Sequence, residues 1–134
     1  MFSHIMIGAR DLETMVAFYD AVLTPLHLQR VVKLEDIDEA GVIWRKGERR
    51  WPQFALRRPI NGLPATWGNG VQISFAAPSR GAVDLAWATA IRTGALDEGA
   101  PALREKYADD FYAAYCRDPE GNKLCFVHAQ GVPA

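Results

Sequence analysis

Few residues of this chain could carry covalent or metal chemistry: it has three histidines and two cysteines among 134 residues. The cysteines, Cys116 and Cys125, stand in two apolar runs on either side of segment 118–122. Two cysteines are too few for a disulfide framework, so we expect free thiols, with a bond between the two runs as the alternative. Cys125 is interpreted as a small buried hydrophobe, because strand alternation would send His128 to the opposite face.

The composition is that of a single globular domain over residues 1–134. Hydrophobic residues make up 49% and charged residues 23%, which is ordinary for a chain of this size with its own core. The net charge of −1 gives no long-range field to attract nucleic acid or an anionic membrane. No apolar run reaches the ~18–20 residues of a membrane helix, and the first residues do not resemble a secretory signal. We therefore expect a cytoplasmic protein that binds neither nucleic acid nor membranes.

Segment 118–122, Asp-Pro-Glu-Gly-Asn, is expected to turn the chain between two strands. Proline presets φ near −65°, and Gly and Asn tolerate positive φ. The flanking apolar runs, residues 112–117 and 123–128, are then the two arms of a β-hairpin.

The chain also repeats itself when His4 is placed over Gln72. The apolar alternation of residues 4–9 then matches that of 72–77, and the helix-capping residues Asp11 and Ser79 coincide. An amphipathic helix is expected after each cap, followed by three strands. The remaining strands are expected at 28–34, 41–46, 53–57 and 96–98. Each half would be a β-α-β-β-β module: the first over 1–59 and the second over 70–130, joined by a Pro- and Gly-rich linker over 60–69.

The Asp118–Asn122 hairpin resembles the "DPxGNxxE" hairpin that ends many proteins of the vicinal oxygen chelate superfamily, which includes glyoxalase I, bleomycin-resistance proteins and extradiol dioxygenases. The opening His4, Asp11-Leu12 and Phe18-Tyr19 are similar to that family's first strand and helix. The resemblance covers nearly the whole chain. It implies an α+β fold in which two tandem βαβββ modules form a curved mixed sheet around a cavity. It also implies a homodimer, in which the cavity is sometimes built across the interface.

In that fold the helices cover the convex face of the sheet, and the concave face lines the cavity. Strand alternation and the aromatic content then predict the cavity residues His4, Met6, Arg57, Gln72, Ser74, Tyr112 and Cys125. Tyrosines and tryptophans in such a cavity would suit a planar or apolar small molecule. Arg57 would either bring a charge for an anionic group or extend to solvent. Segment 99–107 resembles the mobile loop over the pocket of this fold.

Metal-dependent members that resemble glyoxalase I would place ligands at His4, Ala55, Gln72 and Cys125, where histidine, glutamate or glutamine is typical. Ala55 has no donor atom. Cys125 stands where glutamate is usual and would bind only as a thiolate. A set of His4, Gln72 and Cys125 could hold a soft ion such as zinc, but it carries at most one negative charge. We therefore expect no cofactor, with a divalent metal such as zinc as the alternative.

The first hypothesis is a glyoxalase/bleomycin resistance-like protein that binds a small organic molecule in a cavity with a degenerate metal site. The alternative is a divalent-metal-dependent glyoxalase-like lyase or isomerase, in which the metal stabilises an enediolate oxyanion. A metal-free enzyme with Tyr112 or His4 in acid–base roles stays open. Extradiol oxygenation fits least, because it requires two histidines and a carboxylate on one face.

Overall fold

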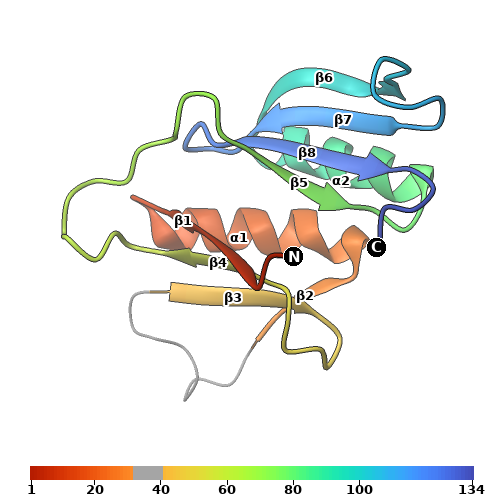
Figure 1. The fold of residues 1–134 in the computed structure, drawn as a ribbon. Coiled ribbons are helices and arrows are strands. Elements are labelled where there is room, and N and C mark those ends of the chain that lie inside the picture. The colour runs from red at the N-terminus through yellow and green to blue at the C-terminus, as the bar shows by residue number, and fades with distance from the viewer. Residues whose placement is uncertain (32–40) are drawn as a thin grey trace.

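The protein consists of two successive halves, each with one strand, one helix and three further strands (Figure 1). The structure is a computed structural model that describes residues 1–31 and 41–134. The first half contains β1 (His4–Gly8), α1 (Leu12–Leu23), the short 3-10 helix η1 (Thr24–Leu26), β2 (Leu28–Arg30), β3 (Gly41–Lys46) and β4 (Gln53–Arg57). The second half contains β5 (Gln72–Ala76), α2 (Arg80–Arg92), β6 (Leu96–Leu103), β7 (Tyr112–Arg117) and β8 (Lys123–His128).

Each half folds into its own four-stranded mixed sheet. The strand orders are β1-β4-β3-β2 and β5-β8-β7-β6. In each sheet the first strand pairs in parallel with the last, and the other pairings are antiparallel. The predicted α+β fold of two tandem βαβββ modules is therefore confirmed. The two sheets stay separate and do not close on each other, since β1 and β5 are both edge strands.

Two strands differ in length from the sequence prediction. Strand β2 ends at Arg30, and residues 32–34 of the strand predicted at 28–34 lie outside the described residues. Strand β6 continues to Leu103, well past residue 98, with register shifts around Gly99. It is an edge strand, so it tolerates Pro101, which has no N–H to donate. Much of the predicted loop 99–107 is therefore part of the sheet.

Both helices begin at the predicted caps and bury one side in a common core. Asp11 accepts a hydrogen bond from the backbone N–H of Thr14, and Ser79 accepts one from that of Ala82, each at 3.1 Å. The apolar faces of α1, α2 and both sheets then share one cluster of buried residues. The rings of Phe54 and Phe75, one from each half, meet edge to face at 5.3 Å. No helix among the described residues is long and apolar enough to cross a membrane.

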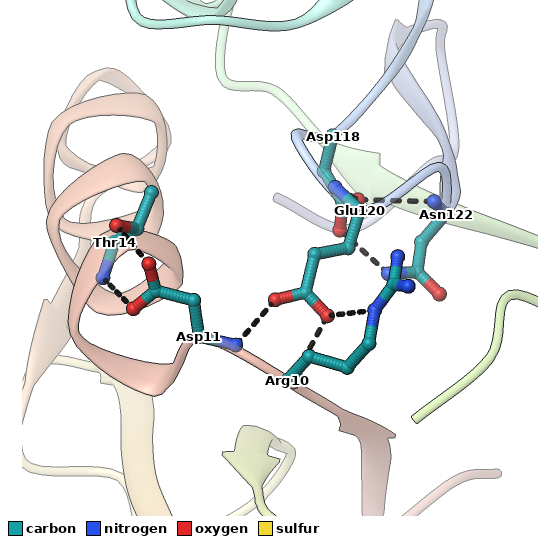
Figure 2. A network of polar contacts seen from close by, with 6 residues as sticks. All are labelled: Arg10, Asp11, Thr14, Asp118, Glu120 and Asn122. Atoms are coloured by element: carbon teal, nitrogen blue, oxygen red, sulfur yellow. Dashed lines mark hydrogen bonds and ion pairs between the residues drawn. The ribbon is translucent and has the colours of Figure 1, made fainter. Parts of the chain in front are cut away.

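The turn between β7 and β8 ties the second half to the start of α1 (Figure 2). The carboxylate of Glu120 accepts hydrogen bonds from the backbone N–H groups of Arg10 and Asp11, at 2.7 and 2.9 Å. Asp118, which is only 3% exposed, accepts from the Asn122 side chain at 2.8 Å and from the Tyr19 hydroxyl of α1 at 2.7 Å. One short turn therefore holds both its own shape and the contact between the halves.

Replacing Glu120 tests this contact. Glu120→Ala should lower the free energy of unfolding by about 1–3 kcal/mol, because two backbone N–H groups lose a charged acceptor. Urea denaturation followed by circular dichroism measures the loss. The exposed Glu105 provides the matched control, since Glu105→Ala should change stability by less than about 0.5 kcal/mol. Equal stability of the two variants would contradict this role for Glu120.

Candidate ligand-binding site

A groove of about 260 Å³ lies on the face of the first sheet opposite the common core. We call it the first-module groove. It is lined by His4, Met6, Gly41, Ile43, Trp51, Gln53, Ala55 and Arg57, with Val42 and Leu56 beneath. Every strand of this sheet except the short β2 contributes to it.

Strand register explains why the hollow forms here. Ala55 of β4 pairs with Met6 of β1 on one side and with Ile43 of β3 on the other. The small methyl group of Ala55 therefore lies between two larger apolar side chains, and the surface is hollowed at Ala55. Next along the strand, Arg57 pairs with Gly8 and Gly41, and a Cβ on Gly41 would come within 2.8 Å of the Arg57 Cβ. The groove follows β4 from Gln53 to Arg57, about 13 Å at the usual rise of a strand.

One end of the groove is aromatic. The rings of His4 and Trp51 have centroids 6.1 Å apart, and Trp51 is 47% exposed. The Arg50 guanidinium lies 5.4 Å from the centre of the Trp51 ring, and the Ser3 hydroxyl hydrogen-bonds with Nδ1 of His4 at 2.9 Å. An indole ring held in this way is a surface on which a planar molecule can stack.

The corresponding face of the second sheet is filled rather than open. Cys125, Ala113 and Val127 form a small buried cluster there, separate from the common core, with Phe111 and Tyr115 packed on it. The guanidinium of Arg104 lies 5.4 Å from the centre of the Tyr115 ring. It is held by a hydrogen bond from Nη2 to the Ala100 carbonyl at 2.7 Å. The chain from β6 to β7 thus closes the position that is a groove in the first half.

Burial disfavours the thiolate form of both cysteines. Burial raises the pKa of Cys125, although hydrogen bonds with Ser74 and Tyr115 oppose that rise. Burial likewise raises the pKa of Cys116 to about 12. Tyr115 pairs with Cys125 and Cys116 with Leu124, so the two thiols point to opposite faces of the hairpin. Both are free, as the sequence predicted.

The predicted cavity residues fall into three places. His4, Met6 and Arg57 line the first-module groove. Gln72 and Ser74 are exposed on β5, where the Gln72 amide donates to the Ser74 hydroxyl at 3.1 Å, and Cys125 pairs with Ser74 beneath the cover of Tyr115.

Tyr112 differs from the expectation, since it packs against the common core and its hydroxyl donates to Asp84 of α2 at 2.7 Å. Alternation along β7 instead places Tyr115 on the face opposite the common core, with Cys125. The five-residue turn pairs Arg117 with Lys123, and this register places Tyr115 opposite Cys125. Counting back from the turn would therefore have identified Tyr115 as the tyrosine that shares a face with Cys125. Sequence reasoning also missed Ile43 and Gly41, because it assigned no face to β3.

The side chains of the described residues do not form a set of ligands suited to a divalent metal ion. No three histidine, cysteine, aspartate or glutamate side chains among them come together as ligands. Of the four positions that the family resemblance assigns to ligands, Ala55 has no donor atom, and Gln72 offers only a neutral amide oxygen. The thiol of Cys125 is buried and its pKa is raised by that burial. His4 is thus the one strong ligand of the four.

A family model described as the Glyoxalase/Bleomycin resistance protein/Dioxygenase superfamily matches residues 1–126. The chain belongs to this superfamily. The resemblance inferred from the hairpin and the repeat is therefore confirmed. Among proteins with curated functions, none shows significant similarity to the chain.

Several solved structures of the glyoxalase superfamily are similar to this chain. A glyoxalase/bleomycin resistance protein from Albidiferax ferrireducens T118 is 38% identical, with a TM-score of 0.83, over 96% of this chain and 98% of that one. A glyoxalase/bleomycin resistance protein/dioxygenase family enzyme from Burkholderia phytofirmans PsJN is 22% identical, with a TM-score of 0.69, over 93% and 95%. Lactoylglutathione lyase from Agrobacterium tumefaciens is also 22% identical, with a TM-score of 0.63, over 95% and 92%. The last two matches show the fold alone.

The cover over Cys125 can be tested by thiol labelling. Arg104→Ala removes the guanidinium that lies against Tyr115, so modification of Cys125 by N-ethylmaleimide should accelerate about tenfold through easier local opening. Peptide mass spectrometry separates Cys125 from Cys116, whose unchanged slow labelling would exclude global unfolding. Lys106→Ala, in the same segment, should have no effect. An unchanged Cys125 rate in Arg104→Ala would show that Arg104 does not hold the cover.

Proposed function

We propose that this glyoxalase-superfamily protein binds a small organic molecule with a planar or apolar body in the first-module groove. The observation that supports this proposal is the groove itself, with its floor of Met6, Ala55 and Ile43 and its exposed Trp51 at one end. Apolar surface with an aromatic wall and a few polar groups is the usual composition of a small-molecule site.

The size and chemistry of the groove limit its ligand. A volume of about 260 Å³ is just below the usual range of ligand pockets, so one or two fused rings are the expected size. The His4 ring and the Gln53 amide bring hydrogen-bonding groups to the same end as Trp51. Arg57 brings a guanidinium to the far end. A ligand would therefore stack on Trp51, lie over Ala55 and direct its polar groups toward the two ends.

We further propose that the protein forms a homodimer that covers part of this groove. Met6, which lines the groove, is 54% exposed, and the neighbouring Ile5 on the same edge strand is 37% exposed. Exposed apolar side chains on an edge strand favour association with another chain.

Binding in the groove can be tested with indole, a neutral planar probe. Titration followed by NMR of the 15N-labelled protein should show saturable shifts at Met6, Ile43 and Ala55. Ala55→Phe fills the floor and Trp51→Ala removes the stacking surface, so each should weaken indole binding about tenfold, equivalent to about 1.4 kcal/mol. Leu96→Ala, at an exposed apolar residue of the second half, is the control. Undiminished binding by both groove variants would refute the proposed site.

The alternative of a metal-dependent lyase or isomerase predicts stoichiometric metal. Given the donors present, we expect substoichiometric zinc, nickel and iron in protein purified without chelator, measured by plasma mass spectrometry. His4→Ala should leave that content unchanged, because His4 has no converging ligands among the described residues. Stoichiometric metal that disappears in His4→Ala would instead support the lyase or isomerase.

A further inference from the structure

The structure has a second and larger cavity, of about 360 Å³. It is bounded by the loop between β1 and α1 and by the segment that leads from β4 toward β5. Its lining residues are Ala9, Arg10, Arg58, Pro59, Gly62, Leu63, Pro64 and Ala65. None of them lines the first-module groove, so the cavity is independent of the proposed function. We call it the linker pocket.

The apolar wall of the linker pocket is firmly built. Ala9 and Ala65 are buried, and a Cβ on Gly8 would come within 2.9 Å of the Ala65 Cβ, so this segment packs directly on the end of β1. The turn that precedes Ala65 in the chain is closed by a hydrogen bond from the Gly62 N–H to the Pro59 carbonyl at 3.1 Å. Prolines and a closed turn keep the wall in one conformation, which reduces the entropy lost on binding.

The turn also presents an apolar side chain to water. The Leu63 N–H donates to the Asn61 side chain at 3.1 Å, which fixes the backbone there. The Leu63 side chain is nevertheless 65% exposed. An apolar ligand surface placed against Leu63 and the two prolines of the wall would remove this area from water.

The charged part of the linker pocket consists of Arg10 and Arg58, whose guanidinium N–H groups can donate hydrogen bonds to a ligand. Among the described residues, Arg58 makes no hydrogen bond or ion pair. Arg10 forms a long ion pair with Glu120, with 3.6 Å between its Nε and the carboxylate oxygen, which is beyond hydrogen-bond distance.

The two nearby carboxylates are already occupied. Glu120 accepts from two backbone N–H groups, and Asp11 accepts from the N–H and hydroxyl of Thr14. The hydrogen bonds of both acids therefore go to the backbone and to Thr14. Glu120 also pairs with Arg10 at longer range, and Asp11 is attracted by the charge of Arg58, but the guanidinium N–H groups form no hydrogen bond with either acid and keep donors for a ligand.

We propose that the linker pocket binds an amphipathic organic carboxylate, with its carboxylate between Arg10 and Arg58 and its apolar body against Pro59, Leu63 and Pro64. A monoanion is favoured over a phosphate dianion, because Asp11 and Glu120 offset the charge of the two arginines. A ligand held there would join the start of α1 to the segment that connects the two sheets. It would therefore stabilise the folded protein.

Octanoate and its neutral counterpart octanamide test this site. Octanoate should give saturable NMR shifts at Ala9, Gly62 and Ala65 and should raise the midpoint of thermal unfolding. Octanamide should bind about tenfold more weakly, since it lacks the charge that pairs with the guanidiniums. Equal binding of the two compounds, or shifts confined to the first-module groove, would overturn the proposal.

Arg58→Gln is the decisive variant, because Arg58 makes no hydrogen bond or ion pair among the described residues, and its interaction with Asp11 is a long-range attraction between charges. It should bind octanoate about tenfold more weakly and lose most of the preference for octanoate over octanamide. Arg49→Gln, at an exposed arginine of another loop, should bind as the unaltered protein does. Leu63→Ser should weaken both compounds equally. Unchanged octanoate binding by Arg58→Gln would overturn the proposal, whatever indole shows at the groove.

Discussion

The hydrogen bonds of the turn between β7 and β8 determine how the two halves sit together. A carboxylate as buried as that of Asp118 requires partners, and it obtains them both from the turn itself and from the Tyr19 hydroxyl of α1. Glu120 adds a negative charge just ahead of α1, where the helix dipole favours one. The Asp-Pro-Glu-Gly-Asn segment, whose sequence indicates the family, therefore connects the second half to α1. None of its residues lines the first-module groove.

The way the two halves pack together leaves one face of each sheet outside the common core. Because the core-facing sides of both sheets share one core, their other faces both lie outside it, and each is either covered or left as a surface. In the first half, Ala55 is flanked by Met6 and Ile43, and the face remains hollow. In the second half, Tyr115 and Arg104 lie over Cys125, and the face is closed. Side-chain volume at corresponding positions of a repeated fold thus decides which half has a hollow on this face.

Local patterns predicted local structure well, and failed where distant segments decide. The caps Asp11 and Ser79 and the alternation of β1 and β4 were sufficient to locate both helices and to place His4, Met6 and Arg57 on one surface. Alternation does not say which sheet edges meet, so it could not show whether the sheets of the two modules join or stay separate. The small residues and proline of β6 carry no apolar alternation, which hid its length. Tyr112 was misplaced because aromatic character was used where hairpin register was needed.

The missing metal ligand and the present groove have one physical cause. The family resemblance assigns the position of Ala55 to a metal ligand, and a glutamate there would place a carboxylate between Met6 and Ile43. Alanine removes the donor, and with it the charge and the volume that would occupy the floor. On the second sheet, Cys125 in place of a carboxylate forms an apolar cluster that Tyr115 can cover, which a buried charge would oppose. The same two residues that remove metal donors therefore leave an apolar groove in one half and a closed surface in the other.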